Sequence, residues 1–252
     1  MDLRLTAAGL LVGTVAGMSG IGGGSLLAPI LILLFGMKAS VAVGTDLIFS
    51  VPMKALAAFT HVRQRTVDLH VVRLLALGGI PGAVAGLAAF ALLRASVSAA
   101  SLELAARHAI GVVILCAAFA SLALHLVRRR VPREQIARPR VTIAIGAAVG
   151  FLVALTSVGS GSITLPLLLI VLPAVPLRAL IGSEIVFAAL MIPVAAAGHI
   201  AFGNVNWGVA LSLTAGALPG AYLGARLCVR MGESTLRPVV IGVLAFAGFK
   251  LL

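Results

Sequence analysis

Residues 17–29, with the sequence GMSGIGGGSLLAP, place a cluster of glycines in the middle of the apolar segment 3–35. A second stretch, residues 154–166 with the sequence ALTSVGSGSITLP, repeats this pattern about 137 residues later. Glycine readily adopts backbone conformations that a helix interior does not use, so each stretch is expected to break a helix. Two matching breaks in the two halves of one apolar chain are typical of a duplicated membrane fold.

The amino-acid composition is that of an integral membrane protein. Of the 252 residues, 61% are apolar and 10% are charged, and the mean hydropathy is +1.19. In soluble domains about a quarter of the residues are charged. The charges also cluster and leave apolar windows of about 20 residues, which is long enough to span a bilayer. The sequence therefore predicts an all-α polytopic membrane protein, with apolar segments at 3–35, 41–62, 70–93, 104–127, 141–172, 178–202, 206–230 and 236–252.

The net charge of +12 does not indicate a nucleic-acid partner. The basic residues lie in short loops between the expected spans, where they determine orientation, and no soluble basic face is left to bind nucleic acid. Cys116 and Cys228 lie in or at the end of apolar spans and have no metal-binding spacing, so we expect neither a metal nor a cofactor.

The two halves of the chain match well beyond the glycine stretches. This internal repeat predicts a first repeat at 1–127, a basic cytoplasmic linker at 128–140 and a second repeat at 141–252, together forming one membrane domain. The matching positions are Pro29 with Pro166, Gly44-Thr45-Asp46 with Gly182-Ser183-Glu184, His61 with His199, and Gly78, Pro81, Gly82 and Gly86 with Gly216, Pro219, Gly220 and Gly224.

The first apolar segment is too long for a simple span. A helix over residues 3–35 would rise about 50 Å, against a hydrocarbon core of about 30 Å. It either crosses once as a broken helix, giving parallel repeats, or forms a re-entrant hairpin followed by three transmembrane helices, giving inverted repeats. With Lys54 excluded, the hairpin arrangement divides the basic residues 13 to 5 between the two sides, and the crossing arrangement divides them 11 to 7. The positive-inside rule therefore favours inverted repeats, with both termini outside and the linker in the cytoplasm.

The broken segments are candidates for binding an anion. Irregular backbone at membrane depth survives only where protein or water covers it, and the N-terminus of a half-helix offers free N–H groups with a positive dipole end. Such half-helices are expected to begin at Gly24-Ser25 and at Gly161-Ser162. The alternative is close helix packing through small residues. The predicted substrate-binding residues are Ser19, Gly22, Gly23, Gly24, Ser25, Lys54, Ser157, Gly159, Ser160, Gly161, Ser162 and Thr164.

Lys54 is the basic residue nearest the middle of an expected span, 41–62. Ionisable groups at membrane depth are costly and usually functional, so Lys54 is the best single candidate for an anion-binding side chain. The alternative is a structural ion pair with Asp46, although about 12 Å of axial rise separates the two residues. The second repeat has Ile192 at the matching position, so the two halves differ electrostatically.

A carboxylate and a histidine recur in the second segment of each repeat. Such groups can carry protons, because burial shifts their titration. The predicted coupling residues are Thr45, Asp46, His61, Glu184 and His199. Helix capping remains an alternative for the carboxylates, because they are expected in the first turns of their helices, and anchoring at the membrane interface remains an alternative for the histidines.

Taken together, the glycine-broken segments, the Gly44-Thr45-Asp46-Leu47 motif with His61 downstream, and the Gly-x-x-Pro-Gly-x-x-x-Gly runs at 78–86 and 216–224 resemble the TauE/SafE family. The resemblance covers essentially the whole chain. It implies a multi-pass permease of the bacterial inner membrane that exports a small anion such as sulfite or a sulfonate. The expected partners are this anion, the lipid bilayer and protons as the coupling ion, and a homo-oligomer is compatible with the sequence.

Other functions remain open at this point. The chain could transport another organic anion, act as an importer, or serve as a subunit or receptor without transport of its own. An intramembrane serine protease is also conceivable, because Gly17-Met18-Ser19-Gly20 fits a nucleophile motif and His61 could act as its base. Against this, the matching residues of the second repeat, 154–157, read Ala-Leu-Thr-Ser.

Overall fold

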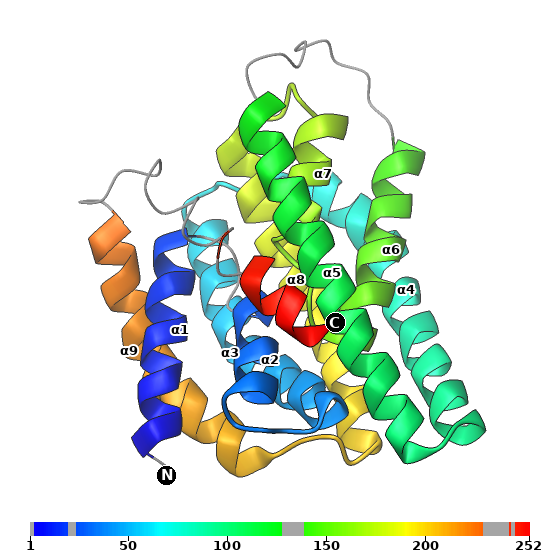
Figure 1. Cartoon of the computed structure of the whole chain (residues 1–252). Coiled ribbons are helices and arrows are strands. Elements are labelled where there is room, and N and C mark those ends of the chain that lie inside the picture. The colour runs from blue at the N-terminus through cyan, green and yellow to red at the C-terminus, as the bar shows by residue number, and fades with distance from the viewer. Residues whose placement is uncertain (1–2, 20–23, 128–138, 229–241, 243–244) are drawn as a thin grey trace.

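The computed structural model describes residues 3–19, 24–127, 139–228, 242 and 245–252 (Figure 1). Over these residues the regular structure is helical and no strand is present. The helices are α1 (Leu3–Ser19), α2 (Gly24–Leu33), α3 (Ala39–Arg63), α4 (Leu69–Ser96), α5 (Ala99–Val127), α6 (Pro139–Thr156), α7 (Thr164–Val171), α8 (Leu177–Ala201) and α9 (Trp207–Cys228). A further helical segment covers residues 245–251.

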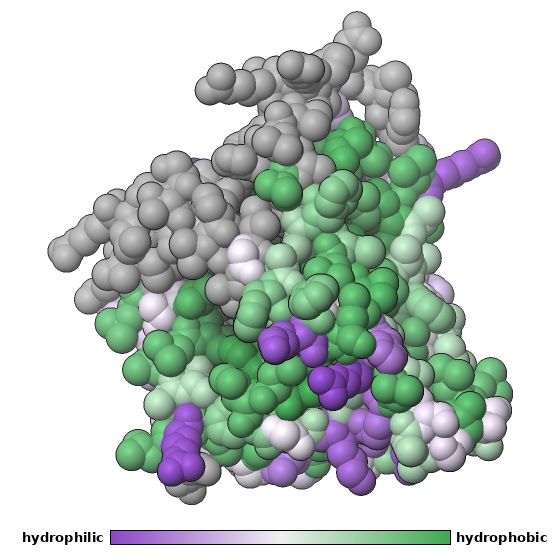
Figure 2. All heavy atoms as spheres, viewed as in Figure 1, coloured by the Kyte–Doolittle hydropathy of each residue, from purple (hydrophilic) through white to green (hydrophobic). Residues whose placement is uncertain are grey.

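Five of the helices in the described part of the chain are long and apolar enough to cross a membrane. They are α3, α4, the Ala99–Ala120 part of α5, α6 and α8. Large apolar side chains such as Leu77, Phe119 and Leu211 are exposed on the outer surface. Figure 2 shows apolar residues covering much of one face, with hydrophilic groups gathered toward its centre and lower edge. Such a surface suits contact with lipid rather than water.

Both predicted helix breaks coincide with helix ends. In the first half α1 ends at Ser19 and α2 begins at Gly24, as expected, while residues 20–23 lie outside the described part. In the second half α6 ends at Thr156, and α7 begins at Thr164, a little later than the expected start at Gly161-Ser162.

The backbone between α6 and α7 explains the later start. Ser157, Gly159 and Gly161 have φ angles of 58°, 129° and 86°. These left-handed values are easy for glycine and costly for most other residues. The chain therefore cannot resume a right-handed helix until it has passed Gly161.

Small residues bring helices from the two halves into close contact. Gly9 and Gly13 of α1 lie against the backbone of α9, and Gly146 and Gly150 of α6 lie against the backbone of α4. A Cβ atom added to Gly9 or Gly146 would overlap the carbonyl oxygen of the facing helix. Glycines at such crossings let two helix backbones approach closely. Each half thus supplies its first helix to a partner in the other half.

The central helix pair, α3 and α8, is held in the same way at both ends. Gly44 of α3 lies against the carbonyl oxygen of Asn204, and Gly182 of α8 lies against that of Thr66. Beside these contacts, Thr45 Oγ1 accepts a hydrogen bond from the Asn206 N–H (3.0 Å), and Ser183 Oγ accepts one from the Asp68 N–H (2.9 Å). Because α3 also contacts α9 and α8 also contacts α4, the α3–α8 pair lies between the α1–α9 pair and the α4–α6 pair (Figure 1).

The close crossing of α4 and α6 predicts that Gly146→Val destabilises the protein. The added atoms would meet the Leu75 carbonyl oxygen, and overpacking of a tight contact costs about 1–3 kcal/mol. Thermal unfolding of the purified protein measures this loss. Gly208→Ala is the control, because an added Cβ there has only Asn206 Oδ1 nearby, at 3.6 Å. Equal stability of Gly146→Val and the wild type would contradict the packing.

Candidate functional site

The segment between α6 and α7 meets a buried carboxylate on α3. Ser157 Oγ donates a hydrogen bond to Asp46 Oδ2 (2.7 Å), and Asp46 is fully buried. The other carboxylate oxygen, Oδ1, is buried and has no hydrogen-bond partner among the described residues. Burial of a carboxylate with an unsatisfied oxygen is costly, so this position is well suited to binding a proton or another cation.

The alternative interpretation of the two carboxylates as helix caps is wrong. The helix α3 begins at Ala39 and α8 begins at Leu177, and neither has an acidic residue in its first turn. Asp46 and Glu184 each lie about two turns further in, where the backbone N–H groups are already bonded within the helix. Both side chains point instead to partners outside their own helices.

Lys54 pairs with a carboxylate from the other half of the chain. Its side chain is buried, and Nζ lies 3.4 Å from Glu184 Oε1. The alternative from the sequence, a structural ion pair between Lys54 and Asp46, is therefore wrong. Lys54 on α3 pairs with Glu184 on α8 instead. Sequence spacing could not indicate this contact, because the two residues are 130 positions apart.

The same Glu184 oxygen has a second donor. Ser160 Oγ, in the segment between α6 and α7, donates to Glu184 Oε1 at 3.0 Å. Close ammonium–carboxylate contacts measure about 2.7–2.9 Å, so the Lys54–Glu184 contact is a long one. The Glu184 carboxylate oxygen thus lies between the Lys54 ammonium group and the Ser160 hydroxyl group, in a buried site at the α6–α7 break.

The remaining polar side chains of this break are also buried. Thr164 Oγ1 donates to the Gly159 carbonyl oxygen (3.1 Å), so this hydroxyl group is bonded within the α6–α7 segment itself. Ser162 Oγ has no hydrogen-bond partner among the described residues. Gly159 and Gly161 contribute backbone rather than side chains. Of the predicted second-repeat set, Ser157 and Ser160 therefore touch carboxylates.

The predicted residues of the first break are only partly described. Gly22 and Gly23 lie outside the described residues. Ser19 ends α1, and Gly24-Ser25 begin α2, but the side chains of both serines lie outside the described part. The expectation that the two breaks share one site stays a prediction.

The two histidines occupy different surroundings. His199 is fully buried, with Nε2 2.9 Å from the Ala154 carbonyl oxygen and its ring against Phe90. His61 is half-buried, and its Nδ1 lies 2.8 Å from Thr66 Oγ1. His199 is therefore packed within the protein rather than placed as an anchor at a membrane interface. The Nδ1 atom of His199 has no partner among the described residues.

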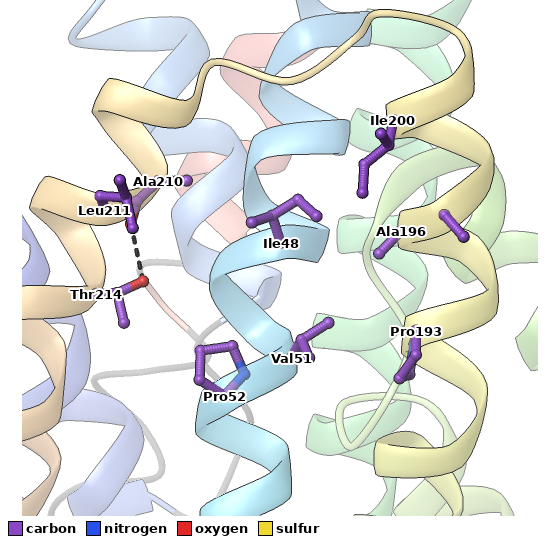
Figure 3. Close-up of a pocket in the computed structure, with 10 residues that line it drawn as sticks. Ile48, Val51, Pro52, Pro193, Ala196, Ile200, Ala210, Leu211 and Thr214 are labelled. Atoms are coloured by element: carbon purple, nitrogen blue, oxygen red, sulfur yellow. Dashed lines mark hydrogen bonds between the residues drawn. The ribbon is translucent and has the colours of Figure 1, made fainter.

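A cavity of about 380 Å³ lies between α3, α8 and α9, and its lining contains none of these charged residues. Figure 3 shows Val51 and Pro52 of α3, Pro193 and Ile200 of α8, and Thr214 of α9 around it. Its one hydroxyl, on Thr214, donates to the Ala210 carbonyl oxygen at 2.8 Å. This lining has no charged side chain, so the charged cluster at the α6–α7 break is the better candidate for an anion site.

Comparison with known proteins identifies the family to which the chain belongs. A family model described as "Sulfite exporter TauE/SafE" matches residues 5–251. The probable membrane transporter protein YjnA of Bacillus subtilis (strain 168) is 33% identical over the full length of both chains. From the same organism, the probable membrane transporter protein YunE is 26% identical over 98% of this chain and 96% of its own, and YdhB is 25% identical over 96% of each. No solved structure matches the chain. The chain is therefore an integral membrane protein that belongs to the TauE/SafE family of membrane transporters.

Proposed function

We propose that this protein is a secondary transporter that exports a small anion, such as sulfite or a sulfonate, across the bacterial inner (cytoplasmic) membrane. The observation that carries the proposal is Lys54, a buried cation held on an apolar helix beside the α6–α7 break. A charge at such a position is costly and is typical of a substrate pathway. The family description, which names sulfite export, supports the same class of substrate.

The proposed substrate site is formed by Lys54 and the hydroxyl groups of the break. Ser160 Oγ already donates to an oxyanion beside Lys54, and Ser162 Oγ is a buried donor without a described partner. An ammonium group and hydroxyl donors are suitable ligands for a sulfur oxyanion. The corresponding residues of the first break, Ser19 and residues 22–25, are predicted from the sequence to belong to the same site, and their side chains lie outside the described residues.

The proposed architecture is a pair of inverted repeats, each a re-entrant hairpin followed by three transmembrane helices. The paired contacts of Gly44 with Asn204 and Gly182 with Thr66 support it, because each contact has its counterpart 138 positions along the chain. Figure 1 adds support, since α1 begins at the lower edge of the molecule and α6 at the upper edge. Alternating access would then proceed by movement of the α1–α9 and α4–α6 pairs about the central α3–α8 pair.

Proton coupling completes the proposal. Asp46 has a buried oxygen without a described partner, so a proton there would relieve the cost of burial. Thr45, His61, Glu184 and His199 form the rest of the proposed coupling set, and all lie on α3 or α8. Movement of the other helices about these two would therefore change the surroundings of each group.

Reconstituted protein is expected to exchange labelled sulfite or a sulfonate, and Lys54→Gln is expected to lower the exchange by about tenfold or more. The panel comprises sulfite, sulfonates, sulfate and carboxylates, assayed by counterflow in liposomes with oriented protein. Lys38→Gln is the matched control, because Lys38 is exposed and precedes α3. Exchange of carboxylates alone, or equal activity of Lys54→Gln and wild type, would contradict the proposal.

The inverted arrangement predicts that equivalent loops lie on opposite sides of the membrane. Gln64 follows the end of α3, and Ala201 is the last residue of the matching helix α8. Both residues are exposed. In a background with Cys116 and Cys228 changed to Ser, an impermeant maleimide should label Ala201→Cys in intact cells. Gln64→Cys should be labelled only after permeabilisation. Labelling of both positions from one side would favour parallel repeats instead.

Proton coupling predicts that the pH gradient loses its effect on uptake when the carboxylates are neutralised. Initial uptake by the wild type should change with an imposed gradient. In Asp46→Asn and Glu184→Gln the ratio of rates with and without the gradient should approach one, because neither amide exchanges a proton. If both variants kept the wild-type ratio, the coupling role would be wrong.

A further inference from the structure

Among the described residues, the carboxylate that contacts Lys54 is that of Glu184. Its Oε1 atom accepts from Ser160 Oγ at 3.0 Å and lies 3.4 Å from Lys54 Nζ. The side chains of Glu184 and Lys54 are only 3% and 9% exposed. These two donors, an ammonium group and a hydroxyl group, are also those that an anionic substrate would need.

We infer that Glu184 is a tethered counter-ion of Lys54. It occupies the anion position beside Lys54 in the empty transporter, and the substrate anion displaces it from there. This inference rests on the proposed function. Two anions cannot share Lys54 without strong repulsion in a buried site, so Glu184 and the substrate compete for it. Glu184 is therefore a positioning residue that sets substrate affinity through Lys54.

The long Lys54–Glu184 distance suits a pair that must open. A buried pair in close contact would have to be broken at high cost, because removing either partner leaves an uncompensated charge. Here the substrate supplies the replacement charge as Glu184 leaves. Ser162 Oγ, which has no described partner, offers an additional donor to an anion larger than one carboxylate oxygen.

The same pairing gives Glu184 a role in the return of the empty transporter. Without substrate, the Lys54 charge can be closed off from water during the change of access at low cost only while Glu184 compensates it. With substrate, the substrate compensates Lys54 in place of Glu184. Loss of the Glu184 charge should therefore tighten substrate binding and slow net transport relative to exchange, because exchange never requires the empty form to reorient.

Glu184→Gln is the direct test, because glutamine keeps the size of the side chain and can still accept from Ser160. The full-length protein in nanodiscs is titrated calorimetrically with sulfite, and counterflow and net efflux are measured in liposomes. The dissociation constant for sulfite should fall about tenfold. Net efflux should fall relative to counterflow. In the Lys54→Gln background, Glu184→Gln should bring a smaller gain in affinity, because no ammonium group is left for Glu184 to occupy.

Glu103→Gln is the matched control, since it makes the same change at a carboxylate on α5 whose partner is Ser40. Its sulfite affinity should equal that of the wild type. If Glu184→Gln does not fold, Glu184→Asp replaces it, because a shorter side chain reaches Lys54 less well and should also tighten binding.

The outcomes separate the inference from the proposed function. Unchanged or weaker sulfite binding in a folded Glu184 variant, with Lys54-dependent binding in the wild type, would overturn only the counter-ion role. Absence of sulfite binding and exchange in the wild type would overturn both.

Discussion

The buried contact between Lys54 and Glu184 is the interaction on which the candidate site depends. An ammonium group inside an apolar helix pair is tolerated only when an opposite charge or a ligand compensates it. The partner comes from α8, in the other half of the chain, and the α6–α7 break adds Ser160 to the same oxygen. This contact therefore joins the two central helices, α3 and α8, across the two halves of the chain.

Close helix crossings make that contact possible. Gly44 and Gly182 let α3 and α8 pass against the loop of the opposite half, and Thr45 and Ser183 add hydrogen bonds to the same loops. A larger side chain at either glycine would separate the two central helices. The glycines at the α4–α6 and α1–α9 crossings place the outer helices in the same manner. Close packing was the alternative interpretation for the small residues of the two breaks, and the structure shows such packing at these other glycines.

Several features of the site could be predicted because they depend on local chemistry. The breaks after Ser19 and Thr156 follow from glycine-rich sequence, and the burial of Lys54 follows from its place in an apolar span. Helix capping by Asp46 and Glu184 was the wrong alternative, because the helices begin about two turns before these residues. The start of α7 was misplaced because three left-handed residues intervene, and a left-handed φ at Ser157 has no clear sequence signal.

The sequence by itself determined the class of the protein, the residues after which the two predicted breaks begin, and the family to which it belongs. These follow from composition, from hydrophobic segment length and from motifs that lie within a few residues of one another. Only the tertiary structure decided which charges meet. Asp46 was the nearest carboxylate to Lys54 in the sequence, yet Glu184 contacts it and Asp46 contacts Ser157. The reason is physical: a rigid helix keeps Asp46 and Lys54 about 12 Å apart along its axis, whereas packing of α3 on α8 brings residues from different halves within reach.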